Sequence, residues 1–346
     1  MTDDRLHVLV VDDSAVVRET VSALLSRDRT MVVTVAADPL IAMDKMRRAR
    51  PDVILLDLEM PRMDGITFLR KLMSEAPLPV VVCSGLTGRG TDAALSALAE
   101  GAVAVIAKAR LGVRNFLESS AAELKQTLRE AARTRPRRPA AGAHRTVEKR
   151  LGLTVTTDKV IAIGASTGGT EAVRVVLEAL PPDAPGVVVV QHMPEAFTGA
   201  FARRLNQSCG VDVREAAHGD RLCEGRVLVA PGNRHLEVRR NGGHYVVGLD
   251  DGAPTSGHRP SVDVLFRSVA RSAAANAVGV LLTGMGADGA DGLLEMRLAG
   301  AFTIAQDEAT SVVFGMPKEA IARNAVDEVL PLERIGSQML RRIRRQ

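Results

Sequence analysis

The feature that most constrains this chain is a series of short apolar runs, each followed by an amphipathic stretch. The first five runs are rich in Val and Ile and apolar throughout, as in strands that are covered on both faces. They are Val8–Val11, Val32–Ala36, Val53–Leu56, Val80–Val82 and Val103–Ile106. In the first amphipathic stretch Val17, Val21 and Leu25 share one face, and Ser14 is placed to cap a helix. Five strands alternating with helices predict a five-stranded parallel (βα)5 sheet.

A second series of the same kind begins after Lys159. Its strand candidates are Val160–Ile163, Val187–Val190, Val227–Val229, Val278–Leu282 and Phe302–Ala305, and its helical stretches lie near Thr170–Leu180, Thr198–Gln207, Val262–Ala274 and Gly289–Leu298. Two further apolar runs flank Asn241-Gly242, a dipeptide typical of a type I′ hairpin turn. This half therefore predicts a second α/β domain, mostly parallel and doubly wound, with an antiparallel hairpin.

The stretch between the two series loses its apolar periodicity and gathers Arg, Lys, Pro and Gly. Such a composition is typical of a connector. We therefore predict a first domain over residues 1–125, a basic linker over 126–157 and a second domain over 158–346. The net charge of +4 is crowded into short stretches, so the charge alone does not argue for a nucleic-acid partner.

Composition excludes several other classes of protein. Three unpatterned cysteines, Cys83, Cys209 and Cys223, argue against a disulfide framework and against a zinc site. The chain has no apolar segment long enough for a membrane span, and its first residues lack a signal-peptide core. We therefore expect a cytoplasmic protein without membrane insertion. With no Trp, one Tyr and seven Phe, the cores must be mainly aliphatic.

Acidic and basic side chains follow the strands of the first series. Asp12 and Asp13 follow the first strand, Asp57 ends the third, Ser84 ends the fourth and Lys108 follows the fifth. Because the carboxyl ends of parallel strands meet at one edge of a sheet, these side chains should converge. Carboxylates suit Mg²⁺, and a lysine and a hydroxyl suit the oxygens of a phosphoryl group. The set indicates phosphoryl transfer to Asp57; solvated loop acids are the alternative for any single residue.

These residues resemble the response-regulator receiver family over residues 6–125. The likeness rests on V-L-V-V-D-D-S-A-V-V-R-E, L-L-D-L-E-M-P-R-M-D-G and the strand that leads to Lys108. The resemblance implies a Mg²⁺-dependent phosphorylation by a histidine kinase. The roles that it implies are phosphoacceptor for Asp57, Mg²⁺ ligands for Asp12, Asp13, Asp57 and the backbone of Glu59, and phosphate contacts for Ser84 and Lys108.

One position departs from the receiver pattern. The residue after Lys108 is Ala109, where the family usually has a proline, often with a cis bond. A cis bond before a residue other than proline costs about 2.5–4 kcal/mol. We therefore expect a trans bond here and a local loop geometry that differs from that of the family.

The second domain opens with a strand that runs into a glycine-rich turn, V-I-A-I-G-A-S-T-G-G. The segment fits G-x-S-x-G, a tight strand-to-helix turn that exposes a serine, here Ser166. A dinucleotide fingerprint needs glycine where Ser166 stands, and a P-loop needs Gly-Lys followed by Ser or Thr. A plain structural turn is the remaining alternative.

A serine nucleophile needs a base, and the base is commonly oriented by a carboxylate. His192 immediately follows the second strand of this domain, so it should lie at the same sheet edge as Ser166. Asp288 lies in a glycine turn after another strand, where it could instead cap the following helix. The Met285 N–H, between two glycines, is a candidate oxyanion donor. The order Ser, His, Asp differs from the Ser, Asp, His order of α/β-hydrolases.

With a receiver in front, this hydrolase-type domain resembles the catalytic domain of the chemotaxis protein-glutamate methylesterases, the CheB family. The likeness spreads over residues 159–322, in I-G-A-S-T-G-G, V-V-Q-H-M-P, F-A-R-R-L-N, V-A-P-G-N-R-H, H-R-P-S-V-D-V-L-F, L-L-T-G-M-G-A-D-G and V-V-F-G-M-P-K-E-A. It implies Ser166 as nucleophile, His192 as general base and Asp288 as orienting carboxylate, without a cofactor for the esterase reaction. The loop 258–261 either lines the cleft or is a turn with a helix N-cap at Ser261.

The same resemblance implies the biological task. The enzyme would hydrolyse glutamate methyl esters on chemoreceptors with release of methanol, and would deamidate certain receptor glutamines. A chemotaxis histidine kinase would phosphorylate the receiver, which covers the active site until it is phosphorylated.

Alternatives of other classes explain less. A DNA-binding response regulator accounts for the receiver and the basic linker, but the second domain shows α/β alternation instead of a helix-turn-helix, so no nucleic acid is expected. A non-catalytic adaptor would not need Ser166, His192 and Asp288 together. The sequence also leaves open that the substrate is a receptor of a pathway other than swimming chemotaxis. The basic tail Arg341–Arg345 is either a solvated helix end or a contact for acidic receptors or lipid.

Overall fold

A computed structural model describes residues 5–60, 63–85, 88–108, 117–134 and 159–343. The chain divides into two compact units, residues 1–141 and 142–346. Most of the segment 126–157 lies outside the described residues, as does Ala109. The domain boundaries and the loop geometry expected from the sequence therefore stay predictions.

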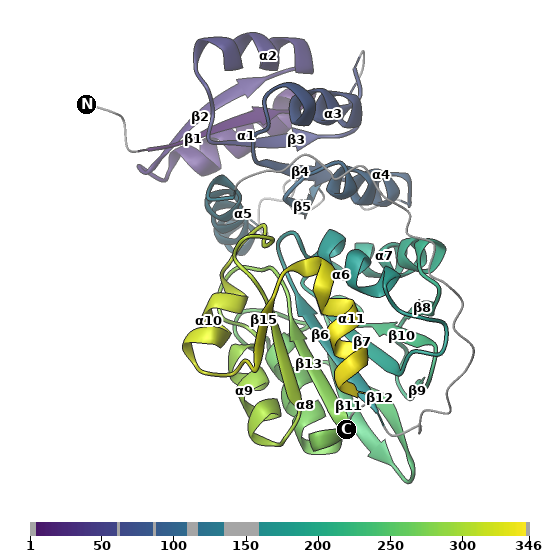
Figure 1. Cartoon of the computed structure of the whole chain (residues 1–346). Helices are drawn as coiled ribbons and strands as arrows, with labels where there is room; N and C mark the ends of the chain where they lie inside the picture. The colour runs from purple at the N-terminus through teal and green to yellow at the C-terminus, as the bar shows by residue number, and fades with distance from the viewer. Residues whose placement is uncertain (1–4, 61–62, 86–87, 109–116, 135–158, 344–346) are drawn as a thin grey trace. The chain divides into compact units, whose positions relative to one another are not determined.

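The first unit is a five-stranded parallel sheet in the order β2-β1-β3-β4-β5 (Figure 1). Its strands are β1 Leu6–Val11, β2 Met31–Ala36, β3 Val53–Asp57, β4 Val80–Ser84 and β5 Ala104–Ala107; its helices are α1 Ala15–Ser26, α2 Pro39–Arg48, α3 Gly65–Glu75, α4 Gly88–Ala99 and α5 Leu117–Ala132. All five predicted strands are confirmed. Strands β3 and β4 are buried along their whole length, which explains their unbroken apolar pattern. Ser14 caps α1 as predicted, by accepting the N–H of Val17.

The second unit is built on a seven-stranded parallel sheet in the order β15-β14-β13-β6-β7-β10-β8. Its strands are β6 Val160–Ala165, β7 Gly186–Gln191, β8 Asp212–Glu215, β10 Arg226–Val229, β13 Ala277–Leu281, β14 Phe302–Gln306 and β15 Glu328–Leu330. Five of these were predicted. The edge strands β8 and β15 are short and carry charged residues, so they show no apolar run. The order reverses between β6 and β13, so the carboxyl ends of both strands border the switch point.

The predicted hairpin is present but belongs to a small sheet of its own. Strands β11 His235–Asn241 and β12 His244–Asp250 pair with each other, and β9 Arg221–Leu222 joins β12 as a third antiparallel strand. The predicted turn pair Asn241-Gly242 is wrong by one residue. Asn241 pairs with His244, so Gly242 and Gly243 form the turn, with Gly242 at φ 59°. Two successive glycines permit the turn in either register, and the strand pairing selects one.

Two groups of helices accompany the seven-stranded sheet (Figure 1). They are α6 Gly169–Glu178, α7 Glu195–Ser208, α8 Val262–Ser272, α9 Ala290–Leu298, α10 Met316–Ala322 and α11 Leu332–Ile343, with a short 3-10 turn at Ala274–Asn276. Helix α6 contacts α7 and α11, whereas α9 contacts α8 and α10. Helix α8 also packs on β11, which joins the small sheet to the core. Phe197 and Phe266 are fully buried among mainly aliphatic side chains, as the composition predicts.

Among the described residues, no helix combines the length and the apolar character that a bilayer span requires.

Candidate functional site

Two carboxylates and an ammonium group meet at the switch point of the first sheet. Asp12 follows β1 and Asp57 ends β3, and each residue is only 2 % exposed. Lys108 follows β5 and places its Nζ 2.7 Å from Asp57 Oδ2 and 3.1 Å from Asp12 Oδ2. The structure thus brings together three residues that the sequence places on separate strands.

The other residues predicted for this site lie around that centre. Asp13 is exposed, and Glu59 is exposed with its N–H 3.4 Å from Asp57 Oδ1. Ser84 is buried, and its hydroxyl donates to the carbonyl of Gly90 in α4 over 2.7 Å. The hydroxyl of Ser84 is therefore engaged with α4 in this structure and would have to turn to contact a phosphoryl group.

The electrostatics of the cluster favour a bound cation. Burial raises the pKa of Asp57, the bond from Lys108 opposes this, and the charge of Asp12 adds to the increase. Burial lowers the pKa of Lys108, but its two carboxylate partners prevail and raise it. Ligand oxygens of Asp12, Asp13 and Asp57 lie within 4.8 Å of one another. Because this is an all-oxygen set with excess negative charge, the residues present fit Mg²⁺.

In the second unit, Ser166 stands on the turn between β6 and α6. The Ser166 N–H donates to the carbonyl of Thr283 over 3.0 Å, and the Ser166 carbonyl accepts the side-chain amide of Gln191 over 2.9 Å. The turn is thus held from both neighbouring strands. Gly168 has φ 76°, and a Cβ there would lie 2.5 Å from the side chain of Val312. Both observations require glycine at this position.

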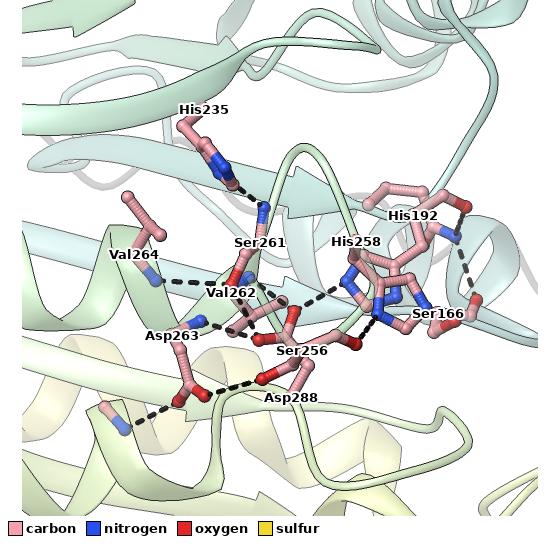
Figure 2. A network of polar contacts seen from close by, with 12 residues as sticks. Ser166, His192, His235, Ser256, His258, Ser261, Val262, Asp263, Val264 and Asp288 are labelled. Atoms are coloured by element: carbon pink, nitrogen blue, oxygen red, sulfur yellow. Dashed lines mark hydrogen bonds and ion pairs between the residues drawn. The ribbon is translucent and has the colours of Figure 1, made fainter. Parts of the chain in front are cut away.

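His192 follows β7, the strand beside β6, and therefore lies next to Ser166 (Figure 2). Ala165 pairs with Gln191, and the His192 N–H donates to the Ala165 carbonyl over 3.1 Å. The ring atom Nε2 of His192 is 2.8 Å from Asp288 Oδ2. Its Nδ1 is buried and has no hydrogen-bond partner among the described residues.

Asp288 supports His192 from the turn between β13 and α9. Its carboxylate also accepts the N–H groups of Val262 and Asp263, over 2.7 and 3.1 Å, and the hydroxyl of Ser261 over 2.7 Å. Burial raises the pKa of Asp288, but the hydrogen bond and charge of His192 and the other bonds outweigh it, so this pKa lies below its ordinary value. An ionised carboxylate only accepts. His192 Nε2 therefore carries a proton, and in the neutral tautomer of this ring the lone pair is on Nδ1.

The alternative that Asp288 caps the helix after it is wrong. Helix α9 has Gly289 as its N-cap, at φ 90° and without a side-chain cap. Asp288 instead binds the N-terminus of α8, a helix that precedes it in the chain. Ser261 is the N-cap of α8, accepting the N–H of Val264 as one of the two alternatives for its loop predicts, and its hydroxyl also donates to Asp288.

His258 is a residue of this site to which sequence reasoning gave no role of its own. Its ring stacks on that of His192, with centroids 3.8 Å apart and planes inclined by 6° (Figure 2). The only signal in the sequence was the H-R-P-S loop, which was expected either to line the cleft or to form a turn.

The turn after β13 lies directly against Ser166. A Cβ on Gly284 would lie 2.8 Å from the Cβ of Ser166 and 2.2 Å from the Sδ of Met316. The Gly284 carbonyl accepts the N–H of Met316 over 2.8 Å, which fixes the turn from the other side. Met285 follows Gly284 in the chain, so its backbone N–H belongs to the same turn that packs against Ser166.

The fold and its two sites define a class of protein, the receiver-controlled hydrolases. One unit gathers carboxylates and a lysine at its switch point, and the other gathers a hydroxyl, an imidazole and a carboxylate at its own. Family models agree with this class: the model described as CheB methylesterase matches residues 161–339, and the response regulator receiver domain model matches residues 8–114. The chain belongs to the CheB methylesterase family.

Similar proteins support the same assignment. The chain is 60% identical over 344 residues to protein-glutamate methylesterase/protein-glutamine glutaminase 1 of Anaeromyxobacter dehalogenans (strain 2CP-C), covering 96% of this chain and 98% of that protein. It is 55% identical over 348 residues to protein-glutamate methylesterase/protein-glutamine glutaminase 2 of Xanthomonas campestris pv. campestris, covering 96% and 99%.

A solved structure matches the second unit. The crystal structure of the Thermotoga maritima CheB methylesterase catalytic domain has 37% sequence identity and a TM-score of 0.52, over 53% of this chain and 97% of that chain. The fold class and the family expected from the sequence are confirmed.

Proposed function

We propose that this chain hydrolyses glutamate methyl esters on chemoreceptors, releasing methanol, and deamidates receptor glutamines, releasing ammonia. The observation that carries the proposal is that Ser166, His192 and Asp288 follow the adjacent strands β6, β7 and β13, with His192 Nε2 bound to Asp288 and with no partner for Nδ1 among the described residues. The relatives of the chain carry names for the same two activities.

The proposed reaction is acyl transfer through Ser166. The Oγ of Ser166 bonds to the ester carbonyl carbon while its proton passes to Nδ1 of His192. The carboxylate of Asp288 stabilises the imidazolium, and the proposed donor to the developing oxyanion is the Met285 N–H. The proton then goes to the leaving methoxide, which departs as methanol. Water attacks the acyl-serine with the same base, which restores Ser166 and leaves glutamate; for glutamine the leaving group is ammonia.

The proposed control lies in the first unit. Asp57 accepts a phosphoryl group from a histidine kinase, and Lys108, already bonded to Asp57, contacts the phosphoryl oxygens. A Mg²⁺ ion held by Asp12, Asp13, Asp57 and the Glu59 backbone would offset the negative charge that gathers there. Ser84 contacts the phosphoryl group after its hydroxyl leaves the carbonyl of Gly90.

The direct test is methanol release from methyl-labelled receptor membranes, with and without acetyl phosphate and Mg²⁺. We expect release that rises when both are added. Release that ignores the phosphodonor would keep the esterase and contradict the control. The absence of release in every condition would refute the proposed substrate and favour another ester or a non-catalytic adaptor.

Replacing the phosphoacceptor should separate control from catalysis. Asp57→Asn should keep the basal rate of methanol release and lose all stimulation by acetyl phosphate, because an amide accepts no phosphoryl group. Asp44→Asn is the matched control, since Asp44 is exposed on α2 and pairs with Arg48 at 2.8 Å; this variant should be stimulated like the unmodified chain. Full stimulation of Asp57→Asn would show that Asp57 is not the phosphoacceptor.

The close approach of Gly284 to the serine turn gives a second test. Gly284→Ala should lower kcat by about 10- to 100-fold, because its Cβ must displace Ser166 and a shift of about 1 Å costs that much. The overpacked variant should also lose about 1–3 kcal/mol of unfolding free energy. Gly243→Ala, where a Cβ meets no atom within 4 Å, should change neither quantity. A folded Gly284→Ala with unaltered kcat would exclude this contact from catalysis.

A further inference from the structure

His258 has no part in the proton transfers proposed above, yet it covers one face of the base. Its ring lies parallel to that of His192 at a centroid distance of 3.8 Å. Burial leaves only 8 % of the His192 side chain exposed. The stacked ring of His258 therefore covers one face of the His192 ring.

The backbone presents His258 in one defined position. Thr255 and His258 form a bridge in which each N–H donates to the other carbonyl, over 3.1 and 2.9 Å. The two residues between them, Ser256 and Gly257, have φ 53° and φ 78°, as a type I′ turn requires. A two-residue turn of this kind allows little movement of the residue that closes it.

A hydrogen bond also fixes the orientation and the tautomer of the His258 ring. Its Nδ1 lies 2.8 Å from the carbonyl oxygen of Ser256. A carbonyl only accepts, so Nδ1 carries the proton of the neutral ring. The next residue, Arg259, donates to the carbonyls of Asp251 and Gly252, each over 2.8 Å, and anchors the turn.

The geometry of the stack argues against a metal centre at this position. Ligand atoms of His192, His258 and Asp288 lie within 4.8 Å of one another, which taken alone suits a transition metal. However, the lone pair of an imidazole nitrogen lies in the plane of its ring. Two rings that are parallel within 6° and face to face direct their lone pairs in separate planes and cannot share one ion without leaving the stack.

The charge state of the stack suits a base that becomes a cation. Burial, and then the charge of His192, lowers the pKa of His258 to about 4, against a smaller opposing effect of Asp288. Arg259 is engaged by its own carbonyl partners. His258 is therefore neutral at neutral pH. When His192 takes the serine proton, its positive charge lies over a neutral aromatic face, which attracts it. This attraction exists only once the proton has moved, so it lowers the barrier without tightening substrate binding.

We propose that His258 is a positioning residue, which holds the ring of His192 in line with Asp288 and stabilises its protonated form through the stack. The inference rests on the proposed function. It adds to that function a residue that acts through the base, His192.

The test compares His258→Ala, which removes the stack, with His258→Phe, which keeps an aromatic face and removes the titrating group. His258→Ala should lower kcat by about 10- to 100-fold, as a base misplaced by about 1 Å does, with KM within about threefold. His258→Phe should restore kcat to within about threefold of the unmodified chain. His244→Ala, at the tip of the β11–β12 hairpin, is the control and should leave both constants unchanged.

A second readout does not depend on turnover. In a Ser166→Ala background, the proton shared by His192 Nε2 and Asp288 should give a far-downfield NMR signal that His258→Phe keeps and His258→Ala loses. If the unmodified chain released no methanol, the proposed function would be refuted. The NMR signal does not require turnover, so it would still decide whether His258 positions His192. A folded His258→Ala variant that keeps both its kcat and its NMR signal would contradict the inference, as would a His258→Ala variant in which only KM rises. A folded His258→Phe variant that is as slow as His258→Ala would also contradict it.

Discussion

Replacing Ser166 by alanine should lower methanol release by about 10⁴-fold or more, since removal of the nucleophile from a serine triad has effects of that size. The fold should survive, because the three hydrogen bonds that hold Ser166 in its turn come from its backbone. We expect the free energy of unfolding to change by less than about 1 kcal/mol. Rates from labelled receptor membranes and unfolding curves in urea measure the two quantities.

Ser337→Ala is the matched control for that loss. Ser337 is exposed on α11, and its hydroxyl donates to the carbonyl of Arg334 over 3.0 Å. It should keep full activity and stability. A Ser166→Ala protein that stays folded and releases methanol at a rate near that of the unmodified chain would place the nucleophile elsewhere.

Asp288→Asn should have the second largest effect, in both activity and stability. Without the carboxylate, His192 loses the partner that fixes its tautomer, a loss that costs about 10⁴-fold in kcat in serine triads. The amide also has one acceptor oxygen and a donating NH₂ where the carboxylate receives Ser261, Val262 and Asp263. A buried donor is then left without a partner, which costs about 1–3 kcal/mol of unfolding free energy.

The pH dependence of this stability difference follows from the lowered pKa of Asp288. An acid whose folded pKa lies below its unfolded value of about 3.9 stabilises the protein fully above that value. The contribution is lost as the pH falls through the folded pKa. The gap in unfolding free energy between the unmodified chain and Asp288→Asn should therefore be constant near neutral pH and narrow below about pH 4.

Asp291→Asn provides the comparison for Asp288. Asp291 lies one residue into α9, with its side chain 56% exposed and paired with Arg323 at 2.8 Å. Its replacement should change the unfolding free energy by less than about 1 kcal/mol, as surface ion pairs do, and should leave kcat unaltered. A gap for Asp288→Asn that widens in acid, or a kcat equal to that of Asp291→Asn, would contradict the role given to Asp288.

The sequence predicts the parallel sheets well because their signal is local. A run such as Val53–Leu56 is apolar on both faces, a pattern that is typical of a strand buried on both sides. Strands β8 and β15 escaped prediction because edge positions tolerate charged and short segments. The hairpin turn was wrong by one residue because Gly242 and Gly243 permit two registers, and the pairing of the longer strands decides between them.

The site residues also differ in how far the sequence alone predicts their roles. Ser166 and His192 could be picked out because each lies within three residues of the end of a predicted strand, and neighbouring parallel strands end at one edge. For Asp57, Asp12 and Lys108 the same rule holds, and the structure brings them into contact. Asp288 was also a candidate, but the sequence left open whether it serves the base or the helix that follows it.

By itself, then, the sequence determined the two doubly wound sheets, the family and the strand ends at which chemistry collects, because hydrophobic period and turn chemistry act over a few residues. Only the tertiary structure decided that Asp288 binds the N-terminus of α8 and that His258 stacks on His192. These contacts join segments that are far apart in the chain. They follow from the order of strands and from the burial of α8 against β6 and β11, which no local pattern encodes.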